Sequence, residues 1–132
     1  MKAYFEKAQG TGILSTADGE GNVNAALYAT PHFMEDGTVA FIMRERLTYQ
    51  NVQANPKACY LFKEAHKIGG YRLYLTKVKE EVDSELLFEI RRKETHIQED
   101  EKLYLVYFNV DKILPILGGK EVTSCPHSKG CC

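Results

Sequence analysis

The chain has 132 residues, enough for one domain with a modest core, and its apolar content of 44% and charged content of 27% are ordinary for a globular protein. A formal net charge of −1 provides no overall basic field for nucleic acid, and no apolar run approaches the ~20 residues of a membrane span. The N-terminal MKAYFEKAQG has no signal-peptide core, and three of the four cysteines lie in the last eight residues, unlike a disulfide-stapled secreted domain. We therefore expect a cytoplasmic protein without nucleic-acid or membrane partners.

The predicted elements are mostly strands. A short amphipathic helix over residues 2–9 comes first, with Tyr4, Phe5 and Ala8 on one side. Alternating, β-branched and aromatic runs then predict six strands, over residues 13–17, 22–30, 38–43, 58–63, 71–82 and 102–110. The strand over 71–82 is long enough to change partners partway, and the strand over 102–110 is apolar on both faces and therefore central. This pattern indicates a mainly β fold, a small antiparallel barrel.

Beyond these strands, a helix with a basic end is predicted over residues 83–93, and a short hydrophobic segment interrupted by Pro115 over residues 111–117. No repeat or linker divides the chain, so we expect one domain over residues 1–119 and a Cys-rich tail over residues 120–132. The tail thiols and imidazole could bind a metal, although their spacing fits no standard motif, or could belong to an exposed terminus. These candidate ligands are Cys125, His127, Cys131 and Cys132.

The strand over residues 22–30 alternates, with Val23, Ala25, Leu27 and Ala29 on one face, and is predicted to be half-buried on that face. Its alanines have two interpretations, which remain open. Small side chains let a flat ring approach the strand backbone closely, or they pack tightly inside a barrel. Pro31 ends regular pairing, and residues 35–37 supply turn chemistry before the next strand.

The strand over residues 38–43 ends in Arg44-Glu45-Arg46, and a short helix then begins at Leu47 and is closed by Asn55-Pro56. Free N–H groups of a helix's first turn and its dipole favour an anion, and Thr48 can add a hydrogen bond. The two arginines and this helix start therefore predict an anion-binding site. The alternative is that Thr48 only caps the helix and both arginines are solvated.

The order strand, turn, strand, Arg-x-Arg-x-Thr-x-x-Asn-Val-x-x-Asn-Pro, strand resembles the flavin-binding split-barrel family related to pyridoxamine 5′-phosphate oxidase, over roughly residues 9–110. The resemblance implies a six-stranded antiparallel split β-barrel with short flanking helices. It also implies a homodimer that binds FMN in the groove between its subunits. Many members carry Lys or Arg where Thr48 stands, so the phosphate charge would fall to Arg44 or Arg46 here. The cofactor-binding residues implied in this way are Ala26, Leu27, Tyr28, Ala29, Met43, Arg44, Arg46, Leu47, Thr48 and Asn51.

No catalytic motif is present: the chain has no G-x-S-x-G, no H-E-x-x-H and no Gly-rich phosphate loop. Isolated histidines are more often surface or structural groups, but His32 lies just past the strand expected to line the flavin. The catalytic residues, the substrate and the electron donor are therefore left unassigned.

We expect an FMN-dependent small-molecule oxidoreductase of this superfamily. The resemblance also implies that it is not pyridoxamine 5′-phosphate oxidase itself, because those enzymes hold their substrate with a longer C-terminal segment rich in Arg and Trp. This chain has no Trp and ends soon after its last strand. The alternatives are a non-enzymatic flavin carrier or electron-transfer protein, a haem-handling split barrel, and a barrel that serves only protein interaction. A deazaflavin in place of FMN also remains open.

Overall fold

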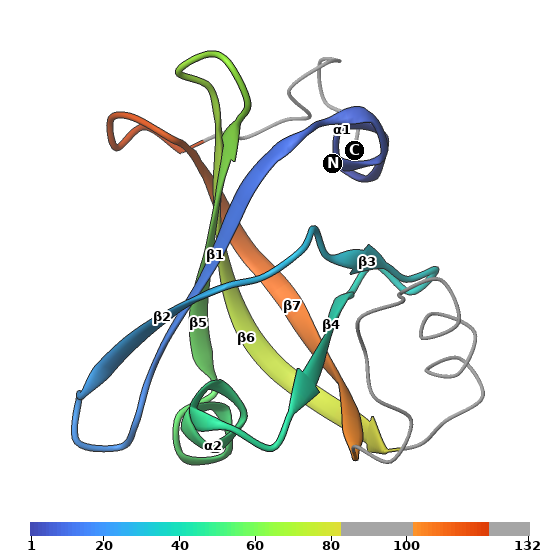
Figure 1. The fold of residues 1–132 in the computed structure, drawn as a ribbon, viewed down its shortest axis with the longest axis vertical. Helices are drawn as coiled ribbons and strands as arrows, with labels where there is room; N and C mark the ends of the chain where they lie inside the picture. The colour runs from blue at the N-terminus through green and yellow to red at the C-terminus, as the bar shows by residue number, and fades with distance from the viewer. Residues whose placement is uncertain (83–101, 122–132) are drawn as a thin grey trace.

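In the part of the chain that the structure describes, seven antiparallel strands form a single sheet in the order β2-β1-β5-β6-β7-β4-β3, which curls around an apolar core (Figure 1). The computed structural model describes residues 1–82 and 102–121. Its elements are α1 (Lys2–Lys7), β1 (Gly10–Ala17), β2 (Val23–Leu27), β3 (His32–Phe33), β4 (Val39–Arg44), α2 (Leu47–Ala54), β5 (Lys57–Glu64), β6 (Gly70–Val82) and β7 (Leu103–Pro115).

The mainly β antiparallel fold predicted from the sequence is confirmed, with one strand more than the six predicted. The addition is the two-residue β3, which pairs with β4 directly after Pro31. The last strand, predicted over residues 102–110, extends further and continues as β7 to Pro115. An irregularity opposite Tyr74 and Leu75 of β6 leaves Asp111 without a pairing partner, and this allows the strand to continue. As predicted, β7 is central, between β6 and β4.

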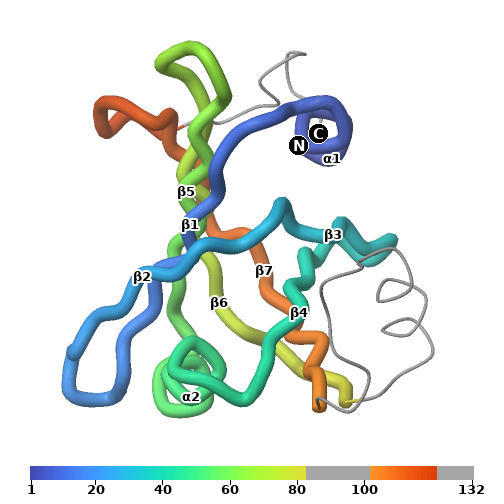
Figure 2. Tube along the Cα trace, viewed as in Figure 1, coloured from blue at the N-terminus to red at the C-terminus, as the bar shows by residue number. Residues whose placement is uncertain are grey.

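The two edge strands are β2 and β3, which follow one another in the chain (Figure 2). The sheet is therefore split between them, and only the connection over residues 28–31 joins the two edges. The long strand β6 helps to give the sheet its curl, since it pairs with β5 as far as Thr76 and with β7 alone beyond that point. The predicted change of partners is wrong, because β6 keeps β7 as its neighbour from Tyr71 to Val82 and only loses β5 beyond Thr76.

The core is dominated by aromatic and branched side chains from the inner face of the sheet. The largest fully buried ones include Tyr60, Phe41, Phe62, Phe108 and Leu73. Helix α1 closes one end of the barrel, where Phe5 packs at 5.2 Å from Phe62 and 5.8 Å from Phe33, measured between ring centroids. Helix α2 lies at the opposite end (Figure 1).

Strand β2 alternates as predicted, but the orientation predicted for it is wrong within this chain. Val23 and Leu27 are 82% and 76% exposed, and Ala25 is also exposed, whereas Asn24 and Ala26 on the other face are half-buried. A period of two separates the two faces of a strand without stating which one meets the core. The apolar face of β2 therefore points away from the barrel interior.

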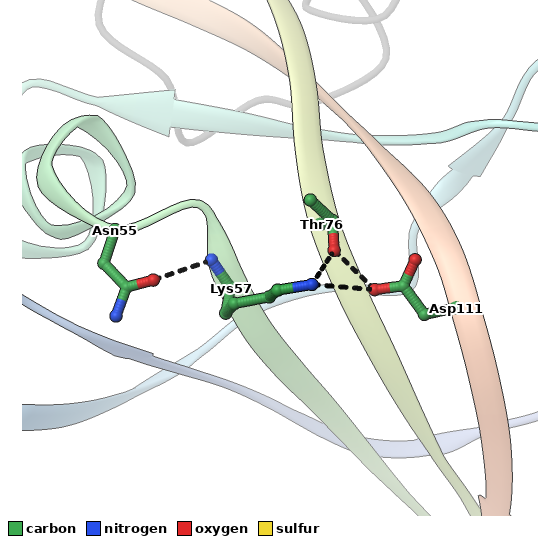
Figure 3. A network of polar contacts seen from close by, with 4 residues as sticks. All are labelled: Asn55, Lys57, Thr76 and Asp111. Carbon is green, nitrogen blue, oxygen red and sulfur yellow. Dashed lines mark hydrogen bonds and ion pairs between the residues drawn. The ribbon is translucent and has the colours of Figure 1, made fainter.

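The end of α2 is fixed as the sequence predicts. Asn55 follows the helix in an extended conformation before Pro56, and its side-chain oxygen accepts a hydrogen bond from the Lys57 backbone N–H at 3.1 Å. The Lys57 ammonium then reaches the Thr76 hydroxyl at 2.8 Å, and that hydroxyl donates to Asp111 at 2.5 Å (Figure 3). This network ties β5, β6 and β7 together, but its exposure to solvent limits its contribution to stability.

The helix predicted over residues 83–93 and the four candidate metal ligands of the tail lie outside the described residues. Within the described residues, neither helix is long and apolar enough to cross a membrane. The proposed boundary between a domain and a tail at residue 119 stays a prediction.

Candidate functional site

A cavity of about 390 Å³ opens where the sheet is split, between β2, β4 and the start of α2. Eight of the predicted cofactor-binding residues line it: Ala26, Leu27, Tyr28, Ala29, Arg44, Arg46, Leu47 and Thr48. The structure therefore gathers residues from two strands and a helix that the sequence suggested separately.

Met43 and Asn51, which were also predicted to bind the cofactor, do not line the cavity. Met43 is 1% exposed in the core, on the opposite face of β4 from Ile42 and Arg44. Asn51 is 4% exposed, and its side-chain amide donates to the Thr16 hydroxyl at 3.0 Å. The structure thus gives Asn51 a visible role in joining α2 to β1.

The remaining lining residues were not among those predicted to bind the cofactor: Asn24, Thr30, His32, Phe41 and Ile42. Their neighbours on β2 and β4 were predicted, so strand periodicity could have found Asn24 and Ile42. His32, noted in the sequence as lying past the β2 strand, contributes to the cavity wall from β3.

The start of α2 carries no side-chain cap. Arg46 is the N-cap residue, in an extended conformation at φ −130° and ψ −168°, and no side chain makes a capping hydrogen bond. The alternative in which Thr48 caps the helix is therefore wrong. Thr48 lies in the first helical turn, is 5% exposed, and hydrogen-bonds the Tyr28 hydroxyl instead. The first-turn N–H groups and the positive end of the helix dipole consequently lie at the cavity wall.

Tyr28 connects β2 to this helix start. Its backbone N–H donates to the Gly12 carbonyl at 3.0 Å, and its carbonyl accepts from the Tyr60 hydroxyl at 3.3 Å. Burial raises the pKa of the Tyr28 hydroxyl, while the Thr48 hydrogen bond and the positive charges of Arg44 and Arg46 act in the opposite direction. Both guanidinium groups therefore lie close enough to influence the Tyr28–Thr48 pair. Together these groups make one end of the cavity positively charged.

The rest of the wall is apolar or small. Phe41 is buried with its ring edge-to-face against Tyr28 at 5.8 Å, and Ile42 and Leu27 add aliphatic surface. Ala26 and Ala29 extend no further than Cβ, so a planar group can approach the backbone of this segment. The sequence left two interpretations of the alanines open, namely close approach of a flat ring and tight packing inside the barrel. Ala26 and Ala29 line the cavity, which is where a ring would have to approach them. The cavity thus combines a cationic end with a flat apolar wall, the usual composition of a ligand pocket.

Histidines and cysteines elsewhere offer no metal site in the part of the chain that the structure describes. No group of three or more His, Cys, Asp or Glu side chains is arranged there to hold an ion. Cys59 is half-buried on β5, and burial raises the pKa of its thiol. This is the state of a packing residue rather than a reactive one.

Comparison with known proteins gives no matching family model and no matching curated protein. Solved structures match over nearly the whole chain. An FMN-binding protein from Syntrophomonas wolfei has a TM-score of 0.69 at 18% identity, covering 89% of this chain and 84% of its own. HupZ from Group A Streptococcus has a TM-score of 0.67 at 17% identity, covering 92% and 95%.

A third structure is a pyridoxamine 5′-phosphate oxidase-related, FMN-binding protein from Nostoc punctiforme, with a TM-score of 0.57 at 10% identity, covering 83% of this chain and 73% of its own. The fold is that of the pyridoxamine 5′-phosphate oxidase-like split barrels. The split-barrel fold implied by the sequence resemblance is therefore confirmed. At these identities the likeness concerns the fold, and the function depends on the cavity.

Proposed function

We propose that the cavity binds FMN, with the phosphate at the start of α2 and the isoalloxazine ring along β2. The observation that carries this proposal is the helix start, which has no side-chain cap and opens into a cavity lined by Arg44, Arg46 and Thr48. A helix N-terminus with adjacent arginines favours a phosphate through the dipole, the free N–H groups and charge-assisted hydrogen bonds. We assign the direct phosphate contacts to Arg46 and Thr48, which lie nearest the helix start. Arg44 then serves the ring or the ribityl chain.

The apolar wall of the cavity is suited to a flat aromatic ring. Ala26 and Ala29 leave the strand backbone accessible, and Phe41, Ile42 and Leu27 supply apolar contacts. The cavity volume of about 390 Å³ falls within the range of ~300–1,000 Å³ typical of cofactor and ligand sites. Two of the solved structures that share the fold are described as FMN-binding proteins, which also supports the choice of cofactor.

With FMN bound, we propose that the protein is a cytoplasmic oxidoreductase acting on a small molecule. The flavin would supply the electron transfer, and the residues of this chain would bind it, orient it and set its electrostatic surroundings. The cationic end would hold the phosphate away from the ring. The apolar wall would exclude water from one face of the ring.

We further propose that the protein is a homodimer whose second copy covers the exposed face of β2. Val23 and Leu27 are 82% and 76% exposed, and Leu47 at the start of α2 is 53% exposed. Leu27 and Leu47 also line the cavity, so a second copy seated there would close its open side. Exposed apolar side chains gathered beside a ligand cavity are typical of an interface.

The test is the absorption spectrum of the protein purified from its natural or a heterologous host, followed by release and chromatography of the chromophore. The proposal predicts flavin bands and one FMN per chain. A Soret band would favour haem handling, and the spectrum of a deazaflavin would identify that cofactor in place of FMN. Absence of binding to added FMN would favour a protein-interaction role. Each of these three results would contradict the proposal.

A further inference from the structure

A carboxylate on β6 is hydrogen-bonded to two successive turns of α2. Glu80 accepts a hydrogen bond from the Tyr49 hydroxyl at 2.5 Å and another from the Gln53 side-chain amide at 2.7 Å. Tyr49 and Gln53 are four residues apart, so they project from the same face of the helix. Lys77 of β6 bonds the same carboxylate at 2.5 Å and compensates its charge. The helix is thereby attached to β6 by side chains that do not line the cavity.

This attachment acts on the first turn of the helix. Tyr49 directly follows Thr48, and its ring stacks on Tyr104 of β7 with the centroids 4.1 Å apart and the planes at 19°. On another side of the helix, Asn51 is bonded to Thr16 of β1. Contacts from β1, β6 and β7 therefore fix both the position of α2 and its rotation about its own axis.

We propose that Glu80 is a positioning residue for the anion-binding end of the cavity, acting through Tyr49 and Gln53. By holding the first turn in place, it sets the direction in which the N–H groups and the Thr48 hydroxyl meet a phosphate. Binding groups keep a productive geometry only when supporting hydrogen bonds hold them. This inference rests on the proposed FMN site, because it assumes that the anion is the phosphate of a flavin nucleotide.

The inference separates two parts of the ligand. The phosphate would depend on the orientation of α2, whereas the ring would lie on β2, which Glu80 does not contact. Releasing the first turn of α2 should therefore weaken the binding of FMN and leave riboflavin, which has no phosphate, unaffected. A residue with only a structural role would weaken both ligands together or neither.

The chain contains a matched control. Tyr4 donates to Glu64 at 2.5 Å, the same pair of groups at the same separation, and it joins α1 to β5 at the opposite end of the barrel from α2 (Figure 1). Lys67 bonds Glu64 at 3.1 Å, as Lys77 bonds Glu80. Removing this second pair tests the loss of a Tyr–Glu bond without touching α2.

The experiment measures the dissociation constants of FMN and riboflavin, together with the melting temperature of the flavin-free protein, for Glu80→Gln, Tyr49→Phe, Glu64→Gln and Tyr4→Phe. In Glu80→Gln and Tyr49→Phe we expect FMN affinity to fall about tenfold, at the lower end of the roughly 10- to 100-fold losses that follow when supporting hydrogen bonds of metal ligands are removed. Riboflavin affinity should stay within about twofold by the same reasoning. Tyr49→Phe keeps the stacked ring, so it serves even if Glu80→Gln folds poorly. The control variants should leave the FMN-to-riboflavin affinity ratio unchanged.

An unchanged ratio in both Tyr49→Phe and Glu80→Gln would overturn the positioning role, whatever happens to the melting temperature. The same conclusion would follow if the control pair changed the ratio as much. Equal affinities of the wild-type protein for FMN and riboflavin would be a different failure: they would overturn the phosphate site itself, and the positioning role with it. The wild-type ratio therefore distinguishes the two failures.

Discussion

Replacing Arg46 by Ala should weaken FMN binding while leaving riboflavin binding nearly unchanged. Arg46 lines the cavity at the uncapped start of α2 and is exposed to solvent. A hydrogen bond to a charged group contributes about 1.5–3 kcal/mol, and solvent screening of an exposed side chain favours the lower half of that range. At 1.4 kcal/mol per factor of ten, we expect a loss of roughly 10- to 40-fold in FMN affinity.

Thr48→Ala provides the internal comparison. Its hydroxyl carries no charge, so in its bond to the phosphate only the acceptor is ionised, and we expect a contribution of about 1.5 kcal/mol or less, which corresponds to at most roughly tenfold. Thr48 is 5% exposed and also bonds Tyr28, so part of its loss should appear as reduced stability of the flavin-free protein. Arg46→Ala should reduce this stability by less, because Arg46 is exposed and lies outside the core.

The assay is a fluorescence titration of both flavins at two salt concentrations. Salt should weaken FMN binding to the wild-type protein more than to Arg46→Ala, since the variant has lost a screened charge. If Arg46→Ala weakened FMN and riboflavin by the same factor, the arginine would hold the fold or the ring. The assignment of the phosphate to this end of the cavity would then be wrong.

Three further predictions follow from the same geometry. Val23 is 82% exposed and does not line the cavity. In light scattering, Val23→Glu should give the 15.0 kDa mass of one chain, whereas the wild type should give twice that mass. A wild-type monomer with FMN bound would contradict the dimer. Gly12→Ala should destabilise the protein by about 1–3 kcal/mol or more in chemical denaturation, because the new Cβ would meet the Tyr28 carbonyl oxygen at 2.5 Å. Gly19→Ala is the control and should leave stability nearly unchanged, because a Cβ there would meet no atom within 4 Å. Burial works to raise the pKa of Glu80, but its bonds with Lys77, Tyr49 and Gln53 hold that pKa below the usual 4.5. The contribution of Glu80 to stability should therefore be present above pH 4.5 and be lost as the pH falls through the lowered pKa. Acid titration of Glu80→Gln should show a smaller loss of stability than the wild type, and an identical profile would refute the assignment.

The helix α2 and the cationic groups at its start could be predicted because their signals are local. Asn55-Pro56 closes the helix, and the arginines and Thr48 lie within five residues of one another. The apolar run over β4 likewise predicts a strand from its own composition. In each case the chemistry that forms the element is contained in one short segment.

Other features could not be predicted because they depend on sheet register. The bond between Tyr28 and Thr48 joins residues of different elements, and the bond between Tyr49 and Glu80 spans 31 positions. Neither is visible until the fold brings Tyr28, which follows β2, and Glu80 of β6 against α2. The outward apolar face of β2 was missed for a related reason, since alternation is the same whether the apolar face meets the core or another chain.

The central claim is that this cavity recognises the phosphate of a flavin nucleotide. Calorimetric titration of the flavin-free wild-type protein with FMN and with riboflavin at moderate salt tests it most directly. Two contacts to the phosphate are counted, one from Arg46 and one from the start of α2, at about 1.5 kcal/mol each. Together they predict that FMN binds at least about 100-fold more tightly than riboflavin. Equal affinities for the two flavins would contradict the claim.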